Sequence, residues 1–149
     1  MVNVEVMSRE AMEQQILNGF PVHTAVISFY DPSDSKIRMK DYKPLDYSNV
    51  CDYVFMVPIH DIDIEILEQY GLSFETYFPE ADELAQYIKM CVSKGMNLIC
   101  QCEYGQSRSA ACAAAIREYY DKSGIEIFAD YRYYPNQLIF NKMLEALRK

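Results

Sequence analysis

One stretch of the sequence constrains the fold more than any other, because an apolar run, a polar turn and a series of small residues follow one another without a break. The apolar run is MNLICQC (Met96–Cys102), the turn continues to Arg108, and the small residues begin SAACAAAIREYY (Ser109–Tyr120). A continuous apolar run of this length is typical of a strand covered on both faces of a parallel sheet. The small residues predict a closely packed helix. We therefore expect a central strand, a tight loop and a buried helix in succession.

Further strands and helices are expected to alternate along the chain. The apolar patterns predict strands over Val2–Met7, His23–Tyr30 and Tyr53–Ile59, and helices over Arg9–Leu17 (with Ser8 as N-cap), from Pro79 to Gly95, and from Asn136 onward. Such alternation predicts an α/β fold, a three-layer sandwich in which a central, mainly parallel sheet is flanked by helices. Ligands bind at the carboxyl ends of the strands in sheets of this kind, and the turn after Met96–Cys102 lies at such an end.

Length and composition fit a single domain spanning residues 1–149. The 22 acidic and 14 basic side chains give a net charge of −8, and no Lys/Arg cluster interrupts the pattern. We therefore expect neither nucleic acid nor an anionic membrane as a partner. The N-terminus lacks the pattern of a signal peptide, which favours a cytoplasmic location. The five cysteines lack the spacing of zinc ligands, so we expect free thiols and no metal site.

The turn CEYGQSR has the features of an anion site. Its backbone N–H groups and the start of the next helix both favour negative charge, and Gly105 permits a close backbone approach. Arg108 can place a bidentate fork on two oxygens of a tetrahedral oxyanion. These positive groups should favour the thiolate form of Cys102. A thiolate beside a bound phosphate is positioned to attack phosphorus, so the turn predicts covalent phosphoryl transfer.

The same residues resemble the signature of the protein tyrosine phosphatase superfamily, which is a cysteine, five residues, an arginine and then Ser or Thr. The form CEYGQSRSA is most similar to the dual-specificity branch. YFPEADELAQYI resembles the helix before that branch's catalytic strand, VPIHD its acid-bearing segment, and YPNQLIFNKML its closing helix. The resemblance runs from about Ala25 to the C-terminus. It implies a cysteine phosphatase-like fold and hydrolysis of phosphomonoesters through a phosphocysteine, without a metal or other cofactor.

The resemblance also implies a role for each residue of the turn. Cys102 would be the nucleophile, Arg108 the clamp on the phosphate oxygens, and Ser109 a hydrogen-bond partner of the departing thiolate. The substrate phosphate would also be bound by the loop amides of Glu103, Tyr104, Gly105, Gln106 and Ser107. One position departs from the family, which usually has His before the cysteine. Gln101 stands there and cannot carry a positive charge, so we expect lower activity than the motif suggests.

The general acid of the family is an Asp that precedes the nucleophile. Asp61 in VPIHD is the preferred residue, and Asp63 is the alternative. Both lie farther from Cys102 than the family's acid usually does, which implies an insertion over Glu65–Glu75. Asp82 falls within an expected helix and is expected to be solvated.

We expect the substrate to be a phosphorylated peptide or protein, carrying phosphotyrosine or also phosphoserine and phosphothreonine, or a small phosphomonoester. Relatives that act on inositol phosphates tend to have extra basic residues in the loop, whereas this loop carries Glu103. Tyr104 and the long polar excursion Asp31–Asp52 are candidates for the wall of the substrate pocket.

Two other functions stay open. A catalytically weak phosphate- or phosphopeptide-binding module would keep the loop without efficient chemistry, and a rhodanese-like sulfurtransferase would carry a persulfide on the loop cysteine. Outside the loop we expect Cys100, Cys112 and Asn136 to have structural roles. Cys100 and Cys112 are expected in the core, with Cys100 on the opposite face of the strand from Cys102, and Asn136 is expected to cap a helix.

Overall fold

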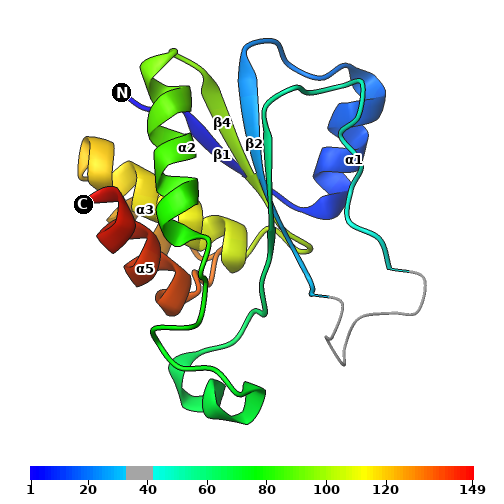
Figure 1. Ribbon diagram of the computed structural model, residues 1–149. Coiled ribbons are helices and arrows are strands. Elements are labelled where there is room, and N and C mark those ends of the chain that lie inside the picture. Colours follow the sequence, from blue (N-terminus) through cyan, green and yellow to red (C-terminus); the bar gives the residue numbers. More distant parts are fainter. Residues whose placement is uncertain (33–41) are drawn as a thin grey trace.

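Parallel strands form the centre of the protein, whose computed structural model describes residues 1–32 and 42–149 (Figure 1). The strands are β1 (Val4–Met7), β2 (Thr24–Tyr30), β3 (Val54–Pro58) and β4 (Asn97–Gln101). Within those residues the order across the sheet is β1-β4-β2-β3, and every neighbouring pair is parallel. The carboxyl ends of the strands therefore meet at one edge of the sheet.

Strand β4 is the central strand that the apolar run predicts. Leu98 pairs with Val4 of β1 on one side, and Ile99 pairs with Val26 of β2 on the other. Leu98 packs into the larger of two apolar clusters and Ile99 into the smaller one, on the opposite face of the sheet. Both faces of β4 are covered, which explains why its sequence is apolar without alternation.

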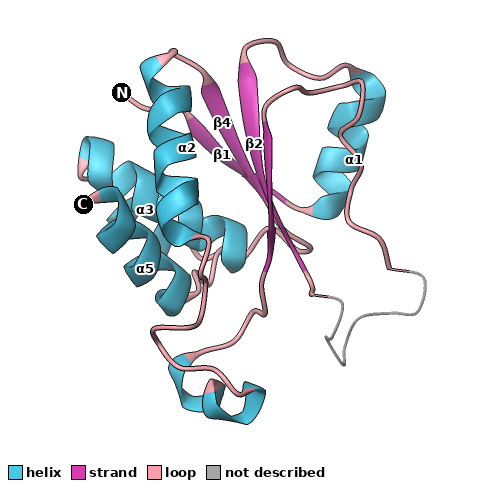
Figure 2. Ribbon diagram, viewed as in Figure 1, coloured by secondary structure: helices cyan, strands magenta, loops and turns pink. Residues whose placement is uncertain are grey.

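Helices cover both faces of the sheet (Figures 1 and 2). One face carries α2 (Ala81–Ser93), α3 (Arg108–Asp121) and α5 (Gln137–Leu147), with the short α4 (Ile125–Phe128) packed against α3. The other face carries α1 (Arg9–Asn18), which begins at the predicted N-cap Ser8. The predicted three-layer α/β sandwich is confirmed, and its sheet is parallel throughout the part of the chain that the structure describes.

Helix α3 is buried around its whole first half. Every residue from Arg108 to Ile116 is buried, and the helix packs against β1, β4 and α5. Five of these nine residues are alanines, whose small side chains let neighbouring backbones approach closely. The closely packed helix expected from the sequence is present, and it starts at the candidate phosphate clamp.

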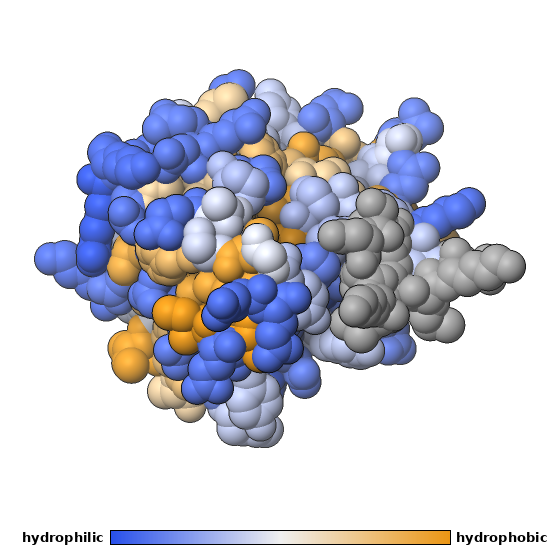
Figure 3. Space-filling model, turned by 60° about the horizontal axis from the view of Figure 1, so that its bottom comes forward, coloured by the Kyte–Doolittle hydropathy of each residue, from blue (hydrophilic) through white to orange (hydrophobic). Residues whose placement is uncertain are grey.

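The insertion expected over Glu65–Glu75 is an ordered projection at the lower end of Figure 1. It contains two 3₁₀ turns, η1 (Ile64–Ile66) and η2 (Glu68–Tyr70). Leu67 between them is 4% exposed and belongs to the larger apolar cluster, so it anchors the projection. Figure 3 brings this end of the molecule forward and shows apolar surface lying beside strongly hydrophilic surface.

The expected excursion Asp31–Asp52 is described only in part, because residues 33–41 lie outside the described ranges. In the described part, Tyr47 is 5% exposed and packs in the smaller apolar cluster together with Leu45 and Val50. This part of the excursion therefore covers the sheet on the side of α1.

The expectation that Cys100 faces away from Cys102 is wrong. Both residues lie in the larger apolar cluster, together with Cys112 from α3. Side chains along a strand alternate between faces, so residues two apart share a face. A hydrogen bond with Cys112, together with burial, raises the pKa of Cys100 well above its ordinary value. Cys100 is thus a neutral core thiol, as its burial requires.

Gly105 is the point where the loop after β4 meets the turn between β1 and α1. Its φ is +65°, and a Cβ added there would lie 2.6 Å from Ser8 N and 2.9 Å from the carbonyl carbon of Met7. Residues with side chains rarely adopt this φ, and the atoms in contact are backbone that cannot swing aside. Only glycine fits this position without displacing the loop from the sheet edge.

We predict that Gly105→Ala lowers the free energy of unfolding by about 2–4 kcal/mol, because it adds both left-handed strain and a backbone clash. Gly71→Ala is the matched control, since Gly71 has a φ of +69° but nothing within 4 Å of an added Cβ. The control should lose only about 1 kcal/mol. Urea denaturation of both variants measures the difference, and equal losses would contradict the role of the contact with Ser8.

Candidate active site

The loop between β4 and α3 is held on one side by the turn between β1 and α1. The N–H of Cys102 donates to Met7 O at 3.2 Å, and the N–H of Arg9 donates to Glu103 O at 3.0 Å. The Arg9 guanidinium also lies 3.9 Å from the Glu103 carboxylate. The first half of the loop is therefore tied to the N-terminal strand and helix.

The second half of the loop is held by the segment that leads into α5. The N–H of Tyr134 donates to Gln106 O at 2.8 Å, and the N–H of Asn136 donates to Ser107 O at 3.2 Å. With the contact at Glu103, three carbonyl groups of the loop are thus bound by residues outside it.

The backbone N–H groups of the loop differ from its carbonyls, because they have no such partners among the described residues. None of the N–H groups from Glu103 to Ser107 makes a hydrogen bond within the described ranges of the chain. A loop whose carbonyls are bound outward and whose amides are unpaired, at the start of a buried helix, can bind an anion. This is the arrangement that the sequence predicts for Glu103, Tyr104, Gly105, Gln106 and Ser107.

Cys102 lies at the base of this loop and contacts Ser109. The Cys102 Sγ and Ser109 Oγ atoms are 3.0 Å apart, and the two residues are 3% and 0% exposed. A hydroxyl at this distance can donate a hydrogen bond to a thiolate, which stabilises the sulfur as an anion. The structure thus brings together the two residues to which the sequence assigns nucleophile and thiolate partner.

Arg108 is a buried charge fixed by two contacts. Its Nη1 donates to Asp31 Oδ1 and to Ile59 O, each at 2.9 Å, while its Nε is buried and has no hydrogen-bond partner within residues 1–32 and 42–149. Burial acts to lower the pKa of this guanidinium, but neighbouring negative groups outweigh it and raise the pKa: Cys102, Asp31 and Asp61. The guanidinium stays charged, and its Nε edge can bind an oxyanion.

Asp31 is a site residue that the sequence analysis missed. It follows directly after β2 and forms an ion pair with Arg108 in which the two side chains are 15% and 6% exposed. The position of an Asp at the carboxyl end of a buried parallel strand was the available signal. In the sequence, Asp31 stands out only as the first residue of the excursion Asp31–Asp52.

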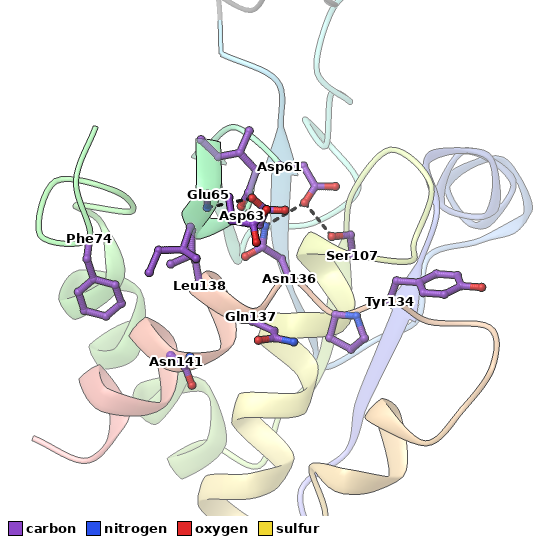
Figure 4. A pocket seen from close by; sticks show the side chains of 13 residues that line it. Asp61, Asp63, Glu65, Phe74, Ser107, Tyr134, Asn136, Gln137, Leu138 and Asn141 are labelled. Carbon is purple, nitrogen blue, oxygen red and sulfur yellow. Dashed lines mark hydrogen bonds between the residues drawn. The ribbon is translucent and has the colours of Figure 1, made fainter. Parts of the chain in front are cut away.

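Asp61, the preferred general acid, lies at the rim of the loop (Figure 4). Its Oδ1 accepts hydrogen bonds from Ser107 Oγ at 2.7 Å and from Asn136 Nδ2 at 3.0 Å. Asp61 is exposed, and one of its partners belongs to the loop itself. Its carboxyl group is therefore positioned beside any group bound in the loop.

The two other candidate carboxylates have local structural contacts. Asp63 caps η1, because its Oδ1 accepts from the N–H of Glu65 at 3.1 Å. Asp82 lies on α2, where both of its oxygens accept from Lys149 Nζ, at 2.9 and 3.0 Å. Within the described part of the chain, neither carboxylate has a hydrogen bond to the loop, so Asp61 is the better-placed acid.

Asn136 has a second role besides the helix cap expected from the sequence. Its Oδ1 accepts from the N–H of Ile139 at 2.9 Å, which is the cap of α5. Its Nδ2 donates to Asp61 Oδ1 at 3.0 Å and to Ile62 O at 2.9 Å. The residue therefore joins the start of α5 to the segment that carries the candidate acid.

Gln101 is the centre of a buried hydrogen-bond network behind Cys102. Its Oε1 accepts from Ser28 Oγ at 2.5 Å and from Tyr47 Oη at 2.8 Å, and its Nε2 donates to Cys102 O at 2.9 Å. Burial raises the pKa of Tyr47 to about 12, so this phenol stays neutral and donates. Gln101 thus braces the base of the loop without adding charge.

Tyr104, a candidate for the pocket wall, is 77% exposed at the tip of the loop. It does not line the pocket beside Asp61 that Figure 4 shows. Across the described residues, no group of three or more His, Cys, Asp or Glu side chains is arranged to hold a metal ion. In the same part of the chain, no helix combines the length and the apolar character needed to cross a membrane.

Comparisons with known proteins identify the fold through structure rather than sequence. No protein-family model and no curated protein sequence matches the chain. Human DUSP28 matches with a TM-score of 0.58 at 16% identity, over 99% of this chain and 96% of that one. Cydia pomonella PTP-2 phosphatase matches with a TM-score of 0.58 at 13% identity, over 96% of this chain and 84% of that one.

A third similar structure is the human tyrosine phosphatase-like serine/threonine/tyrosine-interacting protein. It matches with a TM-score of 0.57 at 15% identity, over 93% of this chain and 83% of that one. At these identities the likeness is one of fold. The chain has the fold of the dual-specificity and tyrosine phosphatases, as its resemblance in sequence predicts.

We predict that Asp31→Asn lowers the free energy of unfolding by about 1–3 kcal/mol, because Arg108 loses the negative partner of a buried pair while keeping an isosteric acceptor. Asp130→Asn is the control, since Asp130 pairs with Arg132 on the surface. That change should have little effect on stability. Urea denaturation compares the two variants, and an equally small effect of Asp31→Asn would argue against a structural role for the buried pair.

We predict that Tyr47→Phe reduces the stability of the protein by about 1 kcal/mol at neutral pH, through the lost hydrogen bond to Gln101. The raised pKa of Tyr47 also gives a signed pH dependence. The folded state holds this proton between about pH 10 and 12 whereas the unfolded state releases it, so this contribution to stability is complete below pH 10 and is lost as the pH rises toward 12.

The Tyr47→Phe variant should therefore lose less stability than the wild type between pH 10 and 12. Thermal unfolding at a series of alkaline pH values measures the difference between the two proteins. Tyr131→Phe, at a residue that is 89% exposed, serves as the control and should follow the wild type. Parallel curves for wild type and Tyr47→Phe would contradict the prediction.

Proposed function

We propose that the protein is a metal-independent cysteine phosphatase, which hydrolyses phosphomonoesters through a phosphocysteine intermediate. The observation that carries this proposal is the arrangement around Cys102. Its sulfur lies 3.0 Å from Ser109 Oγ, at the base of a loop whose amides have no hydrogen-bond partner among the described residues, and Cys102 is close enough to the buried guanidinium of Arg108 to raise its pKa. A phosphate bound by these amides and by the guanidinium would have phosphorus next to the sulfur.

In the first step, the thiolate of Cys102 forms a sulfur–phosphorus bond as the bond between phosphorus and the leaving oxygen breaks. Asp61, at the rim of the loop, donates a proton to that oxygen. Arg108 and the loop amides stabilise the charge on the transferring phosphoryl group. The leaving group departs as a neutral alcohol or phenol.

In the second step, water replaces the protein on phosphorus. The Asp61 carboxylate accepts a proton from the water molecule. At the same time the water oxygen bonds to phosphorus, and the sulfur–phosphorus bond breaks. Ser109 hydrogen-bonds the departing thiolate and stabilises its negative charge. The products are inorganic phosphate and the original enzyme, with Asp61 protonated for the next cycle.

We propose phosphotyrosine-containing or dual-specificity protein substrates. The names of the matching structures support this choice, because two of them are dual-specificity or tyrosine phosphatases. The acidic Glu103 in the loop and the net charge of −8 also favour a phosphorylated peptide over a polyanionic substrate. A cytoplasmic location remains part of the proposal, on the sequence grounds given above.

A second candidate is a phosphate- or phosphopeptide-binding module with little turnover. Gln101 favours a binding module, because this neutral residue occupies the position before Cys102. The family that the sequence resembles usually has His there. One of the matching structures is itself described as a phosphatase-like interacting protein. Turnover of a simple aryl phosphate separates the two candidates.

The test is steady-state hydrolysis of p-nitrophenyl phosphate under reducing conditions and without added metal. We expect Cys102→Ser to abolish turnover, Arg108→Lys to lower kcat/KM by about 10²–10³-fold, and Asp61→Asn to lower kcat and flatten the alkaline side of the pH profile. Cys51→Ser, which changes a thiol far from the loop in sequence, should retain activity. Binding of orthovanadate without any turnover by the wild type would instead favour the binding module.

A further inference from the structure

A pocket of about 560 Å³ adjoins the candidate active site and shares residues with it, among them Asp61, Ser107 and Asn136. Asp61 and Ser107 line the pocket, and the same two side chains are joined by the 2.7 Å hydrogen bond at the rim of the phosphate loop (Figure 4). The pocket lies between the segment after β3, with Phe74 from the insertion, and the start of α5. A chain segment attached to a group in the loop could therefore extend directly into it.

The electrostatic character of the pocket is negative. Asp61, Asp63 and Glu65 gather at one side of it (Figure 4), and its described lining contains no Lys, Arg or His. The Glu65 carboxylate is exposed and has no hydrogen bond or ion pair with any residue that the structure describes. The pocket thus presents carboxylates that a cation can reach.

The rest of the lining combines amide and hydroxyl groups with an apolar part that includes Ile64, Phe74 and Leu138. Leu138 lies between the carboxylates and Phe74 in Figure 4, and Ile64 and Phe74 are 65% and 36% exposed. Leu138 is only 5% exposed and belongs to the larger apolar cluster, so the floor rests on the core. The apolar surface of Leu138 and Phe74, next to carboxylates, suits a ligand with a hydrocarbon stem and a cationic head.

We infer that this pocket binds the side chain of a Lys or Arg that flanks the phosphorylated residue of a peptide substrate, an inference that rests on the proposed function. The alkyl stem would pack on Leu138 and Phe74, and the cation would lie against the carboxylates of Glu65 and Asp63. An acidic flanking residue would be repelled. An apolar one would cover carboxylates without giving them a partner.

The charge of the whole chain acts in the same direction. With a net charge of −8, the protein attracts a basic phosphopeptide and repels an acidic one over long distance. Long-range attraction, however, depends little on where a charge stands in the peptide. A preference confined to particular peptide positions therefore separates the pocket from the overall field.

The experiment uses a set of phosphotyrosyl peptides that differ at one flanking position at a time, which carries Lys, norleucine or Glu. Norleucine keeps the hydrocarbon stem of Lys without its charge. For wild-type protein we expect Lys to raise kcat/KM over norleucine by about five- to tenfold at one or two positions, with Glu the poorest. Added salt should reduce this preference.

Glu65→Lys should remove the preference for Lys at those positions. The kcat/KM for p-nitrophenyl phosphate should stay within about twofold of wild type, because this substrate has no flanking residue to place in the pocket when its phosphate is bound in the loop. Glu68→Lys is the matched control, because it makes the same change of charge at an exposed residue of η2 that does not line the pocket. The control should keep the positional preference.

Two results would overturn the inference: no position at which Lys is preferred, or an equal loss of preference in Glu65→Lys and Glu68→Lys. Failure of the proposed function would look different, since p-nitrophenyl phosphate would then not be hydrolysed at all. In that case the same peptides are compared by fluorescence anisotropy. Tighter binding of the Lys peptides that Glu65→Lys abolishes would support the pocket, and equal binding of all three series would refute it.

Discussion

A guanidinium that is removed from water needs partners close by, and in this protein the partners of Arg108 come from the ends of different strands. Asp31 follows β2, Ile59 follows β3, and Cys102 follows β4. The strands are parallel, so these three groups converge at one edge of the sheet. The charge of one residue at the start of α3 thus depends on the topology of the whole sheet.

Charged groups and neutral polar groups lie on different sides of the loop. Charged groups surround the guanidinium of Arg108, whereas the neutral network of Gln101, Ser28 and Tyr47 lies behind the backbone of Cys102. The network satisfies buried polar atoms without placing a second charge beneath the sulfur. The family that the sequence resembles usually has His at the position before the cysteine. In this protein Gln101 occupies that position and joins a buried network of structural hydrogen bonds.

The parts of the fold and site that could be predicted are contiguous in the sequence. Strand β4, the loop and α3 follow one another directly, so apolar pattern, small residues and a Cys-to-Arg spacing were sufficient to predict them. Asp31 could not be found in this way, because its partner Arg108 is 77 residues away and one acidic residue after a strand has many other uses. The amide contact from Asn136 to Asp61 spans 75 residues and was missed for the same reason. The error over Cys100 had a different origin, since the period of a strand places residues two apart on one face.

The contacts that shape the loop come from segments that carry no candidate nucleophile. Met7 and Arg9 hold its first half, while Tyr134 and Asn136 hold its second half, all through main-chain hydrogen bonds. A chain shortened to begin at Phe20 would keep every candidate catalytic side chain and yet lose half of this support. The N-terminal strand and helix therefore help to hold the loop in the shape that binds an oxyanion. Because the loop is already held in place, binding would require little ordering of it.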